Sequence, residues 1–184
     1  MKKLVRFAPV LLLIATGLHA PSAAAIEKGD VLAGDIATGI LPIVAFGKAW
    51  LMDDTEGEWQ WFRNTVESEV VVTTLRVAFN QTSWGERPNG GSYGFPSGHA
   101  GFVFSQAGFL QERYGWKWGV PALAVSTAIS YIRVREDKHR WRDVIAGGAI
   151  SYGISMLTVT PYKATYLAPI VGPDWLGIRF ERSF

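Results

Sequence analysis

Two stretches of the chain carry the residues whose types and spacing could do chemistry. The first is the tetrapeptide Pro96-Ser97-Gly98-His99, and the second runs from Arg133 to Asp143 and contains His139. The second stretch is densely basic, with Arg133, Arg135, Lys138, Arg140 and Arg142. Such a concentration of positive charge suits the binding of an anion.

His139 and Asp143 are four residues apart. If a helix starts near His139, both side chains lie on one face and the carboxylate can hydrogen-bond one ring nitrogen. The other nitrogen is then unprotonated and nucleophilic. The chain has three histidines, and because His19 lies in a predicted leader, His99 and His139 are the two expected in the mature protein.

Three sequence blocks follow one another in a recognisable order. Arg87-Pro88, then Pro96-Ser97-Gly98-His99, then Arg133 with His139 and Asp143 resemble the motifs of the type 2 phosphatidic acid phosphatase (PAP2) superfamily, which includes vanadium haloperoxidases and bacterial non-specific acid phosphatases. The resemblance covers roughly residues 80–143. Two positions depart from the family pattern: Asn80 stands where the family has Lys, and Ile132 stands where it usually has Ser.

The resemblance implies a role for each matching residue. His139 is expected to attack phosphorus and form a phosphohistidine, while Asp143 orients the imidazole. His99 is expected to protonate the leaving oxygen and then to activate water. The implied phosphate-binding groups are Arg87, Ser97, Gly98 and Arg133, with Asn80 at the position of the family's Lys.

Asn80 is the more consequential departure, because a neutral amide replaces a full positive charge only by hydrogen bonding. An Asn80→Lys substitution is therefore expected to strengthen transition-state binding of a phosphate. If another cation, such as Arg76 or Arg135, already occupies the position of the family's Lys beside the phosphate, Asn80→Lys is instead expected to lower activity.

A zinc site is the main chemical competitor, since His and Asp at four-residue spacing can ligate zinc. His99, His139 and one carboxylate would supply three ligands, but the neighbouring arginines would repel a cation. The chain has no cysteine, which excludes thiol catalysis and cysteine-based metal sites. We expect no metal and no cofactor, as the family resemblance also implies.

The first 25 residues have the three parts of a secretory signal peptide: basic residues, an apolar run from Phe7 to Leu18, and small residues ending at Ala25. A retained membrane anchor is the alternative. Removing the leader's Lys2, Lys3 and Arg6 takes the formal charge from +2 to −1, which gives no case for nucleic-acid binding. Residues 26–184 are expected to form one domain in the periplasm or on the periplasm-facing membrane of a bacterial cell envelope.

The resemblance predicts an all-α bundle of five to six helices, with a short C-terminal β-hairpin predicted from strand alternation. Residues 65–79 contain the β-branched run from Val70 to Thr74, which favours a strand by propensity, but the resemblance places a core helix there. The other predicted elements are helices over 31–52, 98–112 with Ser97 as N-cap, 121–132 and 143–156, a turn over 114–119, and a hairpin turning at Gly172-Pro173-Asp174. Gly147, Gly148 and Gly153 are expected to allow close helix contact.

Uncharged runs of 15 residues (Trp118 to Ile132) and 19 residues (Val144 to Tyr162) are borderline for a bilayer span. We favour membrane association. The leading hypothesis is a cell-envelope phosphatase acting on a lipid phosphate or pyrophosphate. The alternatives are a soluble periplasmic acid phosphatase, a vanadium haloperoxidase, for which the chain is short, and a catalytically silent protein that binds an anionic lipid head group.

Overall fold

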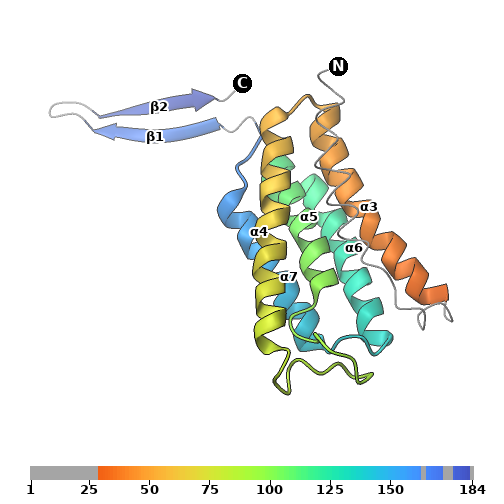
Figure 1. The fold of residues 1–184 in the computed structure, drawn as a ribbon. Coiled ribbons are helices and arrows are strands. Elements are labelled where there is room, and N and C mark those ends of the chain that lie inside the picture. Colours follow the sequence, from red (N-terminus) through yellow and green to blue (C-terminus); the bar gives the residue numbers. More distant parts are fainter. Residues whose placement is uncertain (1–28, 163–164, 172–175, 183–184) are drawn as a thin grey trace.

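Helix α5 (Gly98–Tyr114) is the central element of the fold, because it packs against each of the other four helices in the described part of the chain. These are α3 (Gly29–Leu51), α4 (Thr55–Phe79), α6 (Trp116–Arg135) and α7 (Trp141–Thr158), arranged as a bundle in this computed structural model (Figure 1). The structure describes residues 29–162, 165–171 and 176–182, so the predicted leader lies outside it. The predicted all-α bundle is confirmed.

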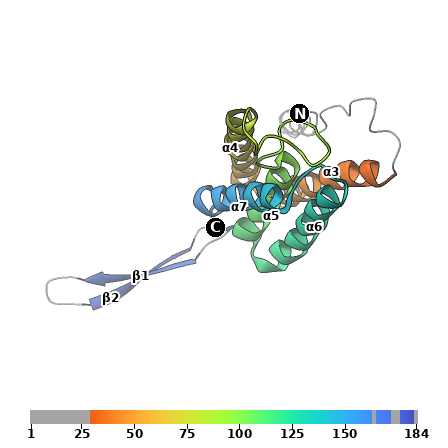
Figure 2. The same ribbon diagram turned by 90° about the horizontal axis from the view of Figure 1, so that it is seen from below.

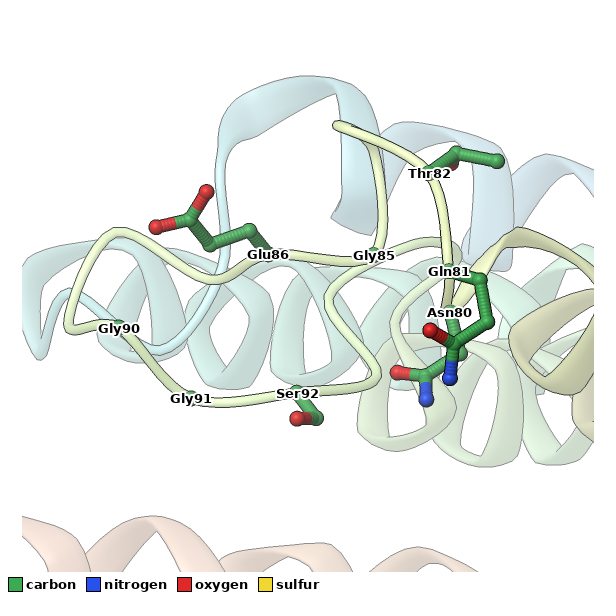
Figure 3. A pocket seen from close by; sticks show the side chains of 8 residues that line it. All are labelled: Asn80, Gln81, Thr82, Gly85, Glu86, Gly90, Gly91 and Ser92. Carbon is green, nitrogen blue, oxygen red and sulfur yellow. The ribbon is translucent and has the colours of Figure 1, made fainter.

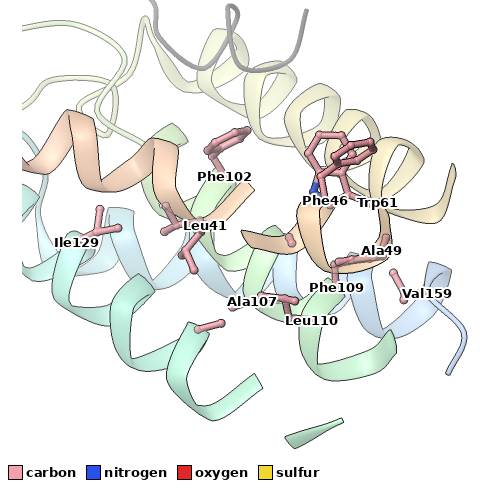
Figure 4. Close-up of a cluster of buried hydrophobic side chains, with 13 residues drawn as sticks. Leu41, Phe46, Ala49, Trp61, Phe102, Ala107, Phe109, Leu110, Ile129 and Val159 are labelled. Carbon is pink, nitrogen blue, oxygen red and sulfur yellow. The ribbon is translucent and has the colours of Figure 1, made fainter. Parts of the chain in front are cut away.

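Burial on all sides explains the central position of α5. Val103, Ala107, Phe109 and Leu110 are at most 1% exposed, and a helix with buried apolar side chains on several sides is stable only when other elements cover it. Side chains of α3 and α4 complete the core, where Phe46 packs against Trp61 with ring centroids 5.1 Å apart (Figure 4).

Helix α4 forms despite its β-branched segment, as the family resemblance predicted. Its buried residues Trp61, Thr65, Ser68 and Val72 recur at spacings of three and four, which puts them on one helical face against the core. Tertiary packing thus outweighs the strand propensity of this segment, which depends on context and amounts to no more than about 1 kcal/mol at each position.

A buried ion pair joins α4 and α5 at the end of the bundle where α4 begins. The Asp54 carboxylate caps α4 by accepting from the Gly57 N–H (2.9 Å) and binds Arg113 through Nε (2.9 Å) and Nη2 (2.6 Å). Burial alone would raise the pKa of Asp54, but hydrogen bonds from Arg113 and Tyr114 lower it overall. This pairing, which spans 59 residues, was not predicted from the sequence.

The junction between α5 and α6 differs from the prediction. Instead of a turn over 114–119, only Gly115 separates the two helices, with a positive φ of 83° that reverses the chain. Helix α6 therefore begins at Trp116, and Pro121 lies inside it rather than in its first turn. Pro121 lacks the N–H that would bond the carbonyl of Lys117, a residue exposed to solvent.

Helix α7 approaches α5 closely at two of the three glycines that the sequence singled out. A Cβ on Gly147 would overlap the Ser97 carbonyl oxygen, and one on Gly148 would lie 3.0 Å from the Phe104 ring. The prediction was wrong for Gly153, where a Cβ would meet nothing within 4 Å. Of the three glycines, Gly147 and Gly148 therefore lie at close helix contacts and Gly153 does not.

Two strands follow the bundle, β1 (Thr165–Val171) and β2 (Leu176–Arg182). They pair antiparallel, with Leu167 opposite Phe180, and extend away from the helices in both views (Figures 1 and 2). The residues of the predicted turn, 172–174, lie outside the described part, so the hairpin as a whole stays a prediction.

Apolar side chains are also exposed on the outer faces of the bundle. Within the described ranges, no helix has both the length and the apolar character needed to cross a bilayer. The exposed large hydrophobic residues include Ile40, Ile43 and Leu51 on α3, Val70 and Val77 on α4, Val120 and Val125 on α6, and Ile145, Met156 and Leu157 on α7.

Gly147→Ala and Gly153→Ala form a matched pair that tests the close approach of α7. We expect Gly147→Ala to lower the free energy of unfolding by about 1–3 kcal/mol, because its methyl group would collide with the Ser97 carbonyl. Gly153→Ala should raise it by about 0.5–1 kcal/mol through helix propensity. Thermal unfolding followed by circular dichroism measures both, and equal melting temperatures would contradict the packing argument.

Candidate active site

The sequence blocks meet at the end of the bundle where α5 and α7 begin and α4 and α6 end (Figure 1). Three backbone hydrogen bonds connect the segments there: Ser97 N–H to the Asp143 carbonyl (2.9 Å), His139 N–H to the Arg133 carbonyl (3.2 Å), and Asn89 N–H to the Asp137 carbonyl (3.1 Å). Segments far apart in sequence are thereby held side by side.

Ser97 is the N-cap of α5, as predicted. Its Oγ accepts from the Ala100 N–H at 3.4 Å, and the residue is fully buried. Gly98 is the first helical residue, so its N–H has no partner within the helix and lies at the positive end of the helix dipole. Half-buried His99 follows in the same turn. This geometry suits a bound oxyanion.

The pairing of His139 with Asp143 differs from the predicted one. Helix α7 begins at Trp141, so His139 precedes it and the two residues do not share a helical face. Asp143 instead closes the first turn, its Oδ2 accepting from the Arg140 N–H at 2.7 Å. The His139 Nδ1 lies 3.9 Å from the same oxygen, too far for a hydrogen bond but close enough for electrostatic support.

A backbone carbonyl orients the His139 ring. The Nδ1 atom lies 2.8 Å from the oxygen of Gly94. A carbonyl can only accept, so Nδ1 carries the proton and donates, and Nε2 keeps its lone pair. The sequence did not reveal Gly94 as the partner, because the loop conformation brings it across 45 residues.

The surroundings of the His139 imidazole and the Asp143 carboxylate lower the pKa of both groups. Burial lowers the pKa of His139 below its usual 6.5, Asp143 opposes this, and the positive charge of Arg87 lowers it further. Burial alone would raise the pKa of Asp143, but His139 and the Arg140 N–H lower it overall. The neutral imidazole beside an ionised carboxylate is therefore the resting state at neutral pH.

Arginine side chains surround this pair. Arg133 is 2% exposed, and its Nη1 lies 3.2 Å from the Glu136 carboxylate. Burial lowers the pKa of half-buried Arg87, the charges of Arg76 and Arg133 lower it further, and Asp143 raises it. Arg87, Arg133, His139 and Asp143 are thus brought within electrostatic range of one another, as their motifs predicted.

Asn80 lies at the C-cap of α4, where its Oδ1 accepts from the Tyr93 N–H at 2.8 Å. It lines an open pocket formed by the loop that follows α4 (Figure 3). Apart from Asn80, none of the residues predicted to do chemistry lines this pocket, whose wall consists of Asn80, Gln81, Thr82, Gly85, Glu86, Gly90, Gly91 and Ser92. The side-chain oxygen Oδ1 of Asn80 therefore stabilises the conformation of the loop.

The arrangement offers a lone-pair nitrogen, neighbouring guanidinium groups and a helix N-terminus at one end of the bundle. These are the parts that phosphoryl transfer requires, because charge on the non-bridging oxygens must be stabilised while a nucleophile attacks. In the described part of the chain, no group of three or more His, Cys, Asp or Glu residues is placed to hold a metal ion.

Comparison with known proteins gives consistent matches. The family model described as PAP2 superfamily matches residues 57–166. The chain is 32% identical over 161 residues to a lipid A 4'-phosphatase of Helicobacter pylori strain J99, covering 82% of this chain and 78% of that protein. It is 33% identical over 119 residues to a lipid A 1-phosphatase of H. pylori strain ATCC 700392, covering 60% and 59%. No solved structure gives a significant match.

The electrostatics of His139 predict a titration midpoint below 6.5, measurable by NMR of the labelled imidazole in the full chain. Asp143→Asn should lower the midpoint further, because it removes a negative charge that stabilises the imidazolium. Arg87→Gln should raise it, because it removes a positive charge that disfavours protonation. A wild-type midpoint at or above 6.5, or shifts of the same sign in both variants, would contradict this electrostatic account.

Proposed function

The chain belongs to the PAP2 superfamily and is a phosphomonoester hydrolase; from this premise we propose that it is a cell-envelope phosphatase that acts on a lipid phosphate or pyrophosphate through a phosphohistidine. The supporting observation is the bond from His139 Nδ1 to the Gly94 carbonyl. It leaves Nε2 as the nucleophilic nitrogen, within range of the positive charge of Arg87.

In the first step, the Nε2 lone pair of His139 attacks phosphorus. The bond to the leaving oxygen breaks, and protonated His99 supplies the proton for that oxygen. Arg87, Arg133 and the Gly98 N–H stabilise the charge on the non-bridging oxygens. Asp143, which is fully buried, stabilises the positive charge that develops on the imidazole.

In the second step, water attacks the phosphohistidine. His99, now neutral, accepts the water proton as the new P–O bond forms and the P–Nε2 bond breaks. Inorganic phosphate leaves, and His139 recovers its lone pair while Nδ1–H still donates to Gly94. No metal or other cofactor takes part in this proposed cycle.

The substrate class rests on the relatives. The proteins matched at 32% and 33% identity are named for removing the 4'- and 1-phosphates of lipid A. A phosphorylated glycolipid is therefore the first substrate to test. The exposed apolar side chains on α3, α4, α6 and α7 support membrane association, since large apolar surface favours contact with a lipid phase.

A phosphate-release panel tests this function. Wild-type protein should release phosphate from lipid A carrying a 4'- or 1-phosphate, or from simpler lipid phosphates and pyrophosphates, and His139→Ala should abolish turnover because the nucleophile is lost. Asp143→Asn should leave a small residual rate, because the Gly94 carbonyl still orients the ring.

The panel also separates the alternatives. Turnover of an aryl phosphate but no lipid substrate would favour a soluble periplasmic acid phosphatase. Absence of turnover in both the wild-type protein and His139→Ala, on every substrate, would favour a silent protein that binds an anionic head group. Turnover by His139→Ala at the wild-type rate would contradict the phosphohistidine.

Inhibition offers a second, independent test. Orthovanadate, a tetrahedral oxyanion that resembles phosphate in transfer, should inhibit competitively because cationic side chains line the site. EDTA should leave the rate unchanged. Loss of activity in EDTA that zinc or magnesium restores would contradict the metal-independent mechanism.

A further inference from the structure

Arg76, in the last turn of α4, lies against the first residue of α5. A Cβ built on Gly98 would be 2.9 Å from Arg76 Nη1 and 3.4 Å from its Cζ. The guanidinium thus occupies the space beside the very residue whose N–H is placed to bind an oxyanion. We propose that Arg76 is a third phosphate-binding cation, acting together with Arg87 and Arg133.

The charges around Arg76 support this assignment. The positive charge of Arg76 is one of the groups that lower the pKa of Arg87, so the two guanidinium groups lie within electrostatic range of each other. Burial lowers the pKa of Arg76 itself, and Glu69, seven residues earlier on the same helix, partly offsets this. Two half-buried guanidinium groups repel each other, so their proximity is unfavourable unless an anion binds between them.

Hydrogen-bonding capacity near the site is also unused. The Nε atoms of Arg76 and Arg87 are buried and have no hydrogen-bond partner within the described residues. Buried donors are normally satisfied, and an unsatisfied one calls for an explanation such as a missing ligand. A tetrahedral phosphate with its several acceptor oxygens is a suitable partner for such donors.

Asn80 acts on Arg76 as a positioning residue. Its Oδ1 accepts from the Tyr93 N–H at 2.8 Å, and the Tyr93 ring lies 5.8 Å from the Arg76 Cζ in a cation–π contact. Tyr93 adopts a positive φ of 61°, which the hydrogen bond to Asn80 helps to hold. A lysine at position 80 would lose this acceptor, so the gain expected from Asn80→Lys on sequence grounds is replaced by an unchanged or lower rate.

The experiment compares Arg76→Gln and Arg76→Met with Arg63→Gln in the full chain. Arg63 lies on the same helix about 20 Å away and is 53% exposed, so Arg63→Gln controls for the loss of a positive charge from α4. The probes are inorganic phosphate and orthovanadate, with affinity measured by calorimetry or inhibition, alongside kcat/KM for an aryl phosphate.

We expect both Arg76 variants to bind orthovanadate at least tenfold more weakly and to lose at least tenfold in kcat/KM, a change of about 1.4 kcal/mol. Arg63→Gln should stay within twofold of wild type. Affinity within twofold of wild type in folded Arg76→Gln or Arg76→Met would overturn the proposal. So would failure of both variants to fold, which would assign Arg76 a structural role, or a tenfold gain from Asn80→Lys.

The inference rests on the proposed phosphatase function, but the two fail in different ways. Orthovanadate affinity that depends on Arg76 in a wild-type protein without turnover would reject the phosphatase and keep the anion site. Turnover that survives in both Arg76 variants with unchanged orthovanadate affinity would keep the phosphatase and reject the role of Arg76.

Discussion

The hydrogen bond from the Ser97 N–H to the Asp143 carbonyl, 2.9 Å long, is the contact on which the site depends. It joins the residue that caps α5 to the first turn of α7, and Gly147 lets the two helices come close enough for it to form. The start of α5, proposed to bind phosphate, and the pair of His139 and Asp143 are thereby held in fixed positions relative to each other. Helix starts with their own caps make a stiffer frame than loops alone would.

The loop between α4 and α5 supplies what the helices cannot. The Gly94 carbonyl selects the tautomer of His139, and the Gly94 N–H is itself held by the Gly85 carbonyl at 2.7 Å. Asp143 is then left to interact with the imidazole mainly through its charge, since its oxygen already accepts from Arg140. Orientation and electrostatic stabilisation, usually attributed to one carboxylate, are divided here between a carbonyl and a carboxylate.

The two ends of the bundle differ in whether their buried arginine groups have hydrogen-bond partners within the protein. At the end where α4 begins, Arg113 and Asp54 form two direct hydrogen bonds, so the charges compensate each other within the protein. At the opposite end, Arg76 and Arg87 each keep a buried Nε without a partner among the described residues. The first arrangement stabilises the fold, whereas the second is suited to an anion that arrives from outside.

The sequence by itself determined the family and the N-cap at Ser97, and through the family resemblance the all-α class, because motif spacing and capping chemistry are local properties. It also named His99, His139 and Asp143 as the candidate catalytic residues. Only the tertiary structure decided which groups touch. The Gly94 carbonyl and the Arg76 guanidinium reach the site through loop conformation and helix packing, across 45 residues to His139 and from α4 to Gly98. Sequence spacing carries no information on such contacts, because the order of residues along the chain does not specify how loops fold over helix ends.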